Sequence, residues 1–508
     1  MEMVLAEPLA DFDVLIIGAG LSGIGVARYL KKECPEKSFA VIEEKPCVGG
    51  TWDLFRYPGI RSDSDMHTMG YAFKPWTRPK AISDGGSILG YIREASRENG
   101  IDPHIRFERR VREASYDSGG QRWTLTIDHG GQTEVLTCRF LFSCAGYYDH
   151  HKGYLPEWDG YGDYKGTLVH PQFWPEDLDY TGKRVAIIGS GATAVTLLPS
   201  LAEKAAHVVQ VQRSPTYIIN RPSEDKYANW MHRWLPDRLA YALSRWRIIL
   251  GGQMRRKKMA ANIKAAKKFF IAGVAQELGD RVDWKKHFVP SYWPGQQRIC
   301  AVPDGDMFQV LREGRASVET GEIDRFVADG LVMKDGTKVQ ADIIVTATGL
   351  VLQFMGGMRV RVDGAEVDPG SLLIYKGFMY SNLPNLIYFT GYTNASWTLK
   401  VDLVAGFACR LLKHMDKVGA TQVVARAGER ELAEKNTAIK FISGYFLRSA
   451  HLLPKHGKAF PWIHEQDYMW DRKTLKRGRV DDGSLEFSGG TPVDLPAEQR
   501  AGVAAAAE

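Results

Sequence analysis

The fold of this chain is decided by the stretch Arg184-Val185-Ala186-Ile187-Ile188-Gly189-Ser190-Gly191-Ala192-Thr193-Ala194. An apolar run that ends in a G-x-G-x-x-A turn is typical of the strand–turn–helix unit that binds a dinucleotide. A stronger copy lies near the N-terminus, in Asp13-Val14-Leu15-Ile16-Ile17-Gly18-Ala19-Gly20-Leu21-Ser22-Gly23. Two such units predict an α/β chain with two dinucleotide-binding, Rossmann-like domains. Two nucleotide cofactors in one chain indicate electron transfer between them.

The composition is that of an ordinary globular protein and excludes several function classes. At 508 residues the chain is too long for one hydrophobic core, and 44% hydrophobic against 25% charged residues argues against disorder. A net charge of +6 argues against a dedicated nucleic-acid binder. The six cysteines include no C-x-x-C pair, so neither a metal site nor a redox dithiol is indicated. Sparse cysteines, and an N-terminus without the apolar core of a signal peptide, predict a cytoplasmic protein.

In the first unit each glycine of the turn has a physical reason. Gly18 permits the tight turn, Gly20 lets the backbone approach a pyrophosphate, and Gly23 lets the helix pack closely on the strand. The N-terminus of the following helix offers free N–H groups to phosphates. Glu43 ends the next predicted strand, at the distance expected for an acid that accepts hydrogen bonds from a ribose.

The second unit predicts a different nucleotide. Its second strand, Val208 to Val211, is followed by Gln212-Arg213-Ser214 rather than by an acid. Loss of the acid with gain of Arg and Ser is the change expected for a ribose 2′-phosphate, onto which an arginine can donate two parallel hydrogen bonds. We therefore expect NADPH rather than NADH in this unit.

The stretch from Tyr227 to Leu278 differs from the rest, because it predicts helices rich in Trp, Lys and Arg. Its most basic run is Arg255-Arg256-Lys257-Lys258. A basic amphipathic helix can lie on a membrane surface. We favour instead a helical insertion that covers the active site and exposes its basic face to solvent.

Two longer motifs flank the glycine turns. Tyr164 to Trp174 resembles the F-x-G-x-x-x-H-x-x-x-W fingerprint of Baeyer–Villiger and flavin-containing monooxygenases, with Tyr in place of Phe. Gly49 to Asp63 resembles the second Baeyer–Villiger pattern, [A/G]-G-x-W-x-x-x-x-[F/Y]-P-[G/M]-x-x-x-D, at every fixed position. The chain thus resembles the class B flavoprotein monooxygenases from about residue 13 to residue 482. Shorter stretches are most similar to the ethionamide-activating type found in mycobacteria.

The resemblance implies FAD in the first unit and NADPH in the second. The residues implied for FAD are Gly18, Gly20, Ser22, Gly23, Glu43, Gly50, Thr51, Trp52, Asp53, Leu54, Asp63 and Val111. Those implied for NADPH are Arg61, Ser62 and Asp63 beside the nicotinamide, Ser190, Gly191, Ala192, Thr193, Ala194, Val195 and Thr196 at the pyrophosphate, and Arg213 and Ser214 at the 2′-phosphate. Gly166, His170 and Trp174 are implied to couple the two domains.

The same resemblance implies a division of the chain. The FAD-binding domain is expected to comprise residues 10–155 and 341–482, and the NADPH-binding domain residues 156–220 and 291–340. The helical insertion is expected at residues 221–290, and a disordered tail at residues 483–508, which are rich in Gly, Pro and Ala.

The implied activity is insertion of one atom of O₂ into a ketone, giving an ester or lactone, or oxidation of a thioether to a sulfoxide, through a C4a-peroxyflavin. Arg298 matches the catalytic arginine of the family and would stabilise the anionic oxygen. Asp63 would hold its guanidinium beside the flavin. Many relatives carry a lysine before this arginine, whereas this chain has Gln297, which leaves more of the NADPH preference to Arg213.

Other functions remain open on the residues alone. An N-hydroxylating flavin monooxygenase acting on amines is the nearest alternative, although the complete match over Gly49 to Asp63 disfavours it. A two-nucleotide disulfide reductase would need a cysteine pair that is missing. A non-catalytic binding module would purify without a coloured flavin. The native substrate and the oligomeric state are not readable from the sequence.

Overall fold

In the computed structural model, which describes residues 11–433 and 442–489, the first glycine turn joins β1 (Phe12–Ile17) to α1 (Leu21–Glu33). Gly18 has φ +98°, and a Cβ there would lie 2.8 Å from the carbonyl oxygen of Cys144. A Cβ at Gly23 would lie 1.8 Å from the carbonyl oxygen of Gly18. Only glycine therefore lets α1 pack this closely on its strand.

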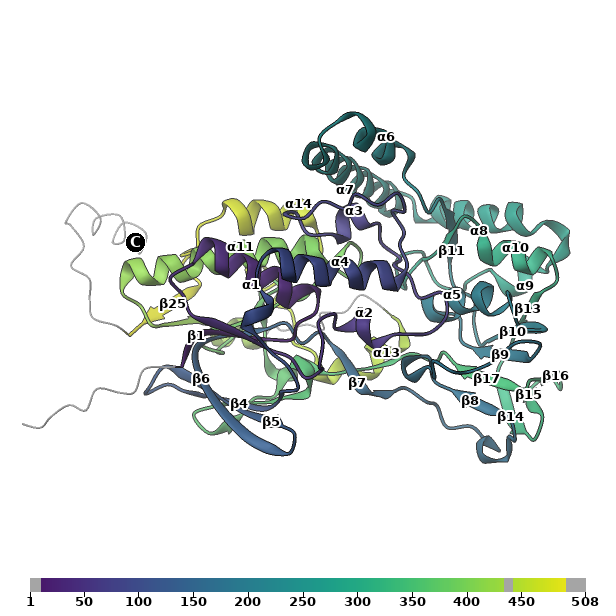
Figure 1. Cartoon of the computed structure of the whole chain (residues 1–508), viewed down its shortest axis with the longest axis horizontal. Helices are drawn as coiled ribbons and strands as arrows, with labels where there is room; N and C mark the ends of the chain where they lie inside the picture. Colours follow the sequence, from purple (N-terminus) through teal and green to yellow (C-terminus); the bar gives the residue numbers. More distant parts are fainter. Residues whose placement is uncertain (1–10, 434–441, 490–508) are drawn as a thin grey trace, which may run out of the picture.

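β1 lies within a nine-stranded sheet of the described residues, in the order β20-β19-β4-β5-β6-β1-β2-β3, with β23 also paired to β6. Its parallel neighbours are β2 (Phe39–Ile42) and β6 (Gln132–Ser143). The other strands are β3 (Ile105–Arg106), β4 (Arg110–Asp117), β5 (Arg122–His129), β19 (Arg359–Val362), β20 (Ala365–Glu366) and β23 (Leu386–Tyr388). Figure 1 shows α1, α4 (Gly85–Glu98) and α11 (Trp397–Val418) together on one face of this sheet, where they enclose the largest buried apolar cluster.

The second glycine turn joins β9 (Arg184–Ile188) to α5 (Ala192–Leu201). It repeats the geometry of the first turn: Gly189 has φ +141°, and a Cβ there would lie 2.3 Å from the carbonyl oxygen of Ala347. Cys144 and Ala347 each follow a strand of their own sheet. In both units, the backbone just after a neighbouring strand therefore packs directly against the first glycine of the motif.

The second sheet is all parallel and has the order β13-β10-β9-β17-β8. Its other strands are β8 (Thr167–Val169), β10 (His207–Gln212), β13 (Ala316–Thr320) and β17 (Ile343–Thr346). The expected domain boundary at residues 340/341 needs correction. β17 follows that boundary in the sequence, yet it lies between β9 and β8 in the second sheet. The chain returns to the first sheet only at β19. The run Ile343–Thr346 is fully buried in that sheet, and the sequence cannot tell which of two similar sheets buries such a run.

The insertion lies between β11 (Ile218–Arg221) and β12 (Cys300–Pro303), which pair in parallel. It consists of α6 (Lys226–Trp234), α7 (Asp237–Ala261), α8 (Ile263–Leu278) and α9 (Trp284–His287). In Figure 1 α6 and α7 form the upper edge of the molecule, above both sheets. The remaining short elements of the second half include α10 (Asp306–Arg312), β14 (Ile323–Val327), β15 (Gly330–Met333) and β16 (Lys338–Gln340).

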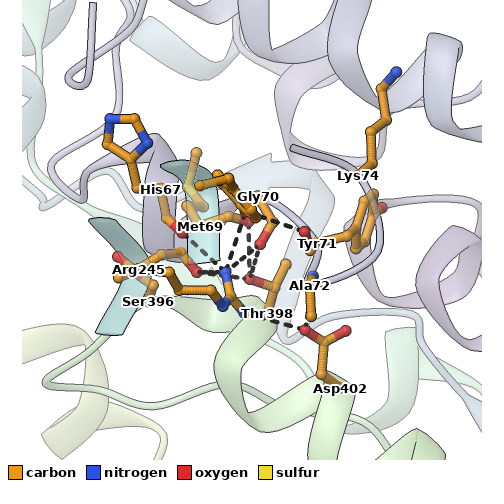
Figure 2. A network of polar contacts seen from close by, with 12 residues as sticks. His67, Met69, Gly70, Tyr71, Ala72, Lys74, Arg245, Ser396, Thr398 and Asp402 are labelled. Atoms are coloured by element: carbon orange, nitrogen blue, oxygen red, sulfur yellow. Dashed lines mark hydrogen bonds and ion pairs between the residues drawn. The ribbon is translucent and has the colours of Figure 1, made fainter. Parts of the chain in front are cut away.

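Arg245 of α7 fixes the insertion to the helices that cover the first sheet (Figure 2). Its Nη1 donates to the carbonyl oxygens of His67 (3.0 Å), Thr68 (3.1 Å) and Gly70 (2.7 Å), in and just after the short helix α3 (Met66–Met69). Its Nη2 lies 3.1 Å from the Asp402 carboxylate of α11, and both side chains are about nine-tenths buried. One guanidinium therefore holds three elements that are far apart in sequence.

The C-terminal part of the described chain corrects the expected tail. β25 (Leu485–Ser488) pairs antiparallel with β24 (Gln422–Ala425), and Leu485 is buried in the same cluster as α11. The expectation of disorder from residue 483 is therefore wrong for this strand. Its alternation of apolar and polar residues is only four residues long and is hidden among glycines and prolines. Residues 490–508 lie outside the described residues.

We predict that Gly23→Ala destabilises the fold while Gly191→Ala does not. A Cβ at Gly23 would overlap the Gly18 carbonyl oxygen, whereas a Cβ at Gly191 would meet no atom within 4 Å. The expected cost at Gly23 is about 1–3 kcal/mol of unfolding free energy, measured by urea unfolding. Equal midpoints for the two variants would contradict the close packing of α1.

We also predict that Arg245→Met costs about 3–5 kcal/mol, because it leaves the buried Asp402 carboxylate without its partner. Arg247→Met is the matched control, since Arg247 lies on the same helix but forms an exposed ion pair with Asp225. That change should cost less than about 1 kcal/mol. Thermal unfolding of both variants checks this; a similar loss in both would refute the role of Arg245.

Candidate active site

The first glycine turn and the first turn of α5, which follows the second glycine turn, border one cavity of about 360 Å³. It extends from the turn before α1, past Arg298, to the first turn of α5. The predicted site residues that line it are Gly18, Gly20, Ser22, Glu43, Gly50, Thr51, Trp52, Arg61, Ser62, Asp63, Val111, Ala192, Thr193, Val195, Thr196 and Arg298. Residues from five separate stretches of sequence are thus brought together.

The other residues predicted for the two nucleotides do not line the cavity. Asp53 is buried and forms ion pairs with Lys45 (3.2 Å) and Arg56 (3.0 Å). Leu54 ends the short helix α2 (Thr51–Leu54), and Gly23 lies beneath the first turn. The remaining ones belong to the second unit and are Ser190, Gly191, Ala194, Arg213 and Ser214.

The end of the cavity at the first turn fits a dinucleotide. A Cβ on Gly50, whose φ is +55°, would lie 3.0 Å from the Cα of Gly20, so two backbones without side chains meet here. No side chain caps the N-terminus of α1, which leaves its N–H groups for an anion. The buried Glu43 carboxylate accepts hydrogen bonds from the N–H groups of Ala19 (2.6 Å) and Lys45 (2.9 Å), and burial raises its pKa.

The end at the second turn is open. Gly191, at the start of α5, is exposed and has no neighbour within 4 Å of its would-be Cβ, and no side chain caps the helix. Gln212, which replaces the ribose-binding acid, is buried and donates to the carbonyl oxygen of His287 (2.7 Å). The exposed Arg213 is the next side chain along the chain. Burial lowers the pKa of Arg448, and the positive charge of Arg213 lowers it further.

Arg298 and Asp63 form an ion pair on the cavity wall. The Arg298 Nη1 lies 2.5 Å from the Asp63 Oδ2, and the two side chains are 39% and 40% exposed. The Asp63 carboxylate raises the pKa of Arg298 well above its already high value. The guanidinium is therefore a permanent cation whose position is set by a single carboxylate.

Three tyrosines that the sequence did not single out surround this pair. The hydroxyl oxygens of Tyr147 and Tyr148 are 3.2 Å apart, and the Tyr445 hydroxyl makes a hydrogen bond with Arg298. Burial raises the pKa of Tyr445 to about 12 and raises that of Tyr148 as well. The sequence could have indicated Tyr147 and Tyr148, because they come directly after the short turn whose backbone contacts Gly18. Tyr445 follows no recognisable motif.

Trp397, at the start of α11, closes another side of the cavity. Its Nε1 donates to the Ser22 hydroxyl (2.8 Å), and its ring lies 5.5 Å from that of Tyr147. Tyr147 and Trp397 therefore form one aromatic wall of the cavity, and this wall lies next to the first glycine turn.

Arg61 ties the Asp63 loop to the second domain. Its guanidinium forms an ion pair with Asp306, the first residue of α10, and its Nη2 lies 3.4 Å from the Asp306 Oδ1. The adjacent Ser62 is buried, and its N–H donates to the carbonyl oxygen of Ser83 (2.9 Å). The loop that carries Asp63 is thus held on both sides.

The predicted coupling residues lie at the crossing between the domains. The two strands that run between the sheets, β7 (Tyr148–Gly153) and β18 (Leu350–Leu352), pair with each other. The His170 ring lies directly against Gly153, where a Cβ would be 2.2 Å from it, and its Nδ1 accepts the N–H of Gln172 (3.2 Å). Burial lowers the pKa of His170, which makes it a neutral packing group.

Gly166 and Trp174 support the same segment. A Cβ at Gly166 would lie 2.5 Å from the carbonyl oxygen of Asp342, so glycine is needed where the chain enters β8. Trp174 is buried in the apolar cluster of the second domain, with its ring 6.5 Å from that of Tyr180.

Within residues 11–433 and 442–489, no three His, Cys, Asp or Glu side chains are arranged to hold a metal ion. In the same described part of the chain, no helix combines the length and the apolar character needed to cross a bilayer.

Comparison with known proteins gives the family. A flavin-binding monooxygenase-like family model matches residues 79–440, and a model of the NAD(P)-binding Rossmann-like domain matches residues 16–78. The chain is 47% identical over 478 residues to the FAD-containing monooxygenase EthA of Mycobacterium tuberculosis, covering 94% of this chain and 97% of EthA. It is 45% identical to the probable FAD-binding monooxygenase AlmA of Acinetobacter baylyi, covering 94% and 96%. The chain therefore belongs to the flavin-binding monooxygenase family.

Solved structures show the same fold at low identity. An oxidised steroid monooxygenase bound to NADP aligns with a TM-score of 0.76 at 21% identity, covering 94% of this chain and all of that one. An open structure of cyclohexanone monooxygenase gives 0.75 at 20% identity, covering 94% and 99%. The two-domain architecture is thus that of the Baeyer–Villiger monooxygenases.

Proposed function

We propose that this monooxygenase converts ketones to esters or lactones and oxidises thioethers to sulfoxides, with FAD and NADPH as its cofactors and O₂ as co-substrate. When bound and reduced, the flavin supplies the activation of O₂. The observation that carries the proposal is the Arg298–Asp63 ion pair on the wall of a cavity that is bordered by the first glycine turn and by the first turn of α5. A fixed cation suits a reaction in which negative charge develops on an oxygen atom.

We assign FAD to the first turn and NADPH to the second. The bare backbones at Gly20 and Gly50 leave room for a pyrophosphate, and Glu43 is in place for the ribose. At the second turn, the open first turn of α5 would take the pyrophosphate, and Arg213 with Ser214 would take the 2′-phosphate. Because the first glycine turn and the first turn of α5 border the same cavity, the two nucleotides can face each other there.

The proposed roles follow from the charge states of the residues. Arg298 cannot give up its proton, so it acts by electrostatic stabilisation of an anionic oxygen and not as an acid. Asp63 positions the guanidinium. The hydroxyls of the half-buried Tyr148 and Tyr445 are protonated at neutral pH, as in any tyrosine, and burial raises their pKa further. They can therefore donate hydrogen bonds to a substrate oxygen.

The test is turnover of the purified, yellow holoenzyme with NADPH and O₂ over a panel of linear ketones, cyclic ketones and aryl sulfides. Mass spectrometry should find products heavier by one oxygen atom. If the panel yields only hydrogen peroxide while primary amines give hydroxylamines, the enzyme is an N-hydroxylating monooxygenase and the proposal fails.

We predict that Arg298→Ala lowers the rate of oxygenation by about 10²–10³-fold, while reduction of the flavin by NADPH stays measurable in anaerobic stopped flow. Arg298→Lys should recover only part of the rate, because an ammonium keeps the charge but not the planar, fixed set of donors of a guanidinium. Arg325→Ala, at an exposed ion pair, is the control. If the Arg298→Ala variant formed ester at the wild-type rate, Arg298 would not be the group that stabilises the anionic oxygen.

We predict that Arg213→Ala raises the KM for NADPH by about tenfold to a hundredfold, since hydrogen bonds to charged groups contribute about 1.5–3 kcal/mol. The KM for NADH should change little, because NADH lacks the 2′-phosphate. Steady-state kinetics with both nucleotides measure the ratio. An equal rise for both would show that Arg213 does not bind that phosphate.

A further inference from the structure

The helical insertion exposes more large apolar side chains than any other part of the described chain. Trp230 and Trp234 of α6 are 62% and 67% exposed, and Met254 of α7 is 67% exposed. The complete set on α6, α7 and α8 is Tyr227, Trp230, Trp234, Leu239, Leu243, Leu250, Met254 and Phe269. Groups of this size are costly to leave in water, and a contiguous patch of them marks an interaction site.

These side chains are ordered along the helices. On α6 the exposed aromatic residues are spaced by three and four positions, which places Tyr227, Trp230 and Trp234 on one face. On α7 the exposed apolar residues are spaced by four, seven and four positions, from Leu239 to Met254, which is again a single stripe. We call these two faces together the apolar face of the insertion.

The opposite side of α7 already has its partners. Ala240, Tyr241, Ser244 and Arg245 are buried, and Arg245 makes the contacts to α3 and α11 drawn in Figure 2. The apolar face is therefore the outward side of a firmly anchored helix. It lies at the upper edge of the molecule, where α6 and α7 rise above the sheets (Figure 1).

Strong positive charge accompanies the apolar face. Residues 226–278 contain twelve lysines and arginines but only two acids, Asp237 and Glu277, a surplus of ten positive charges. The whole chain has a net charge of +6, so the rest of the molecule is net acidic. The charge is interleaved with the apolar groups: the Arg233 guanidinium lies 5.8 Å from the ring centre of Trp234, and Arg255 to Lys258 directly follow Met254.

We propose that the apolar face of the insertion docks on an anionic lipid membrane, with α6 and α7 lying in the headgroup region. Tryptophan is the side chain best suited to that region, since its body is apolar and its N–H is polar. Lysines and arginines next to a membrane add about 1 kcal/mol each when the lipids are anionic. An amphipathic helix with Trp and Leu on one side and cations around it has the composition of interfacial helices.

The charge decides against a second copy of this chain as the occupant. Two copies of this face would bring two surfaces rich in lysine and arginine against each other, and like charges across an interface cost several kcal/mol. An anionic lipid surface instead offers negatively charged headgroups to the lysines and arginines and an apolar interior to the tryptophan and leucine side chains.

The test is flotation of the full-length holoenzyme with vesicles. Vesicles of one part phosphatidylglycerol to three parts phosphatidylcholine should carry the protein upward at low salt, and pure phosphatidylcholine vesicles should carry at least tenfold less. The double variant Trp230→Ser/Trp234→Ser should lose about tenfold in vesicle partitioning while keeping its bound flavin and its turnover of a water-soluble ketone. Trp470→Ser, at a 40% exposed tryptophan of α14 (Tyr468–Asp471), is the matched control and should float like the wild type.

The proposal is overturned if the wild type does not float with the anionic vesicles, or if the double variant floats as well as the wild type. It is also overturned if the double variant changes the mass of the particle in light scattering without changing flotation, since the face would then join two protein chains. Failure here leaves the monooxygenase assignment intact, because that assignment is read from oxygenated products.

Discussion

The contact between Arg298 and Asp63 is the constraint on which the site depends. The two residues are 235 positions apart in the sequence, yet their side chains meet at 2.5 Å. Asp63 comes from the loop that follows α2, and Arg298 from the stretch that leads into β12 beyond the insertion. For this pair to form, the insertion must fold and seat correctly, and the two sheets must hold one relative position.

Several features hold that position. The strands that cross between the sheets, β7 and β18, pair with each other, and the His170 ring packs on Gly153 so closely that no side chain fits there. Arg61 reaches Asp306 of the second domain from the same loop that carries Asp63. Arg245 joins the insertion to α3 and α11. Ion pairs contribute little when they are fully exposed, but Arg61 and Asp306 are only 15% and 33% exposed, and Arg245 and Asp402 are about nine-tenths buried.

The sequence predicted those parts of the structure that depend on local sterics. Positions 18, 23 and 189 must be glycine, because a Cβ at each would lie within 3 Å of a carbonyl oxygen. The glycine motif in the sequence therefore already predicts this local backbone geometry. The placement of β17 could not be predicted in this way, because a short apolar run fits the centre of either sheet. The start of α11 at Trp397 could not be predicted either, since its first turn is fixed by tertiary contacts of Trp397 and Thr398.

The site residues that the sequence missed were missed for a related reason. Tyr445 reaches Arg298 from a segment with no motif, and only the fold brings it there. The insertion was recognised as basic and helical, but which of its residues face outward depends on where Arg245 anchors α7. A buried guanidinium that binds three backbone carbonyls sets the rotation of the helix about its own axis. That rotation turns Leu239, Leu243, Leu250 and Met254 outward, so the same contact that secures the active-site loops also creates the apolar face.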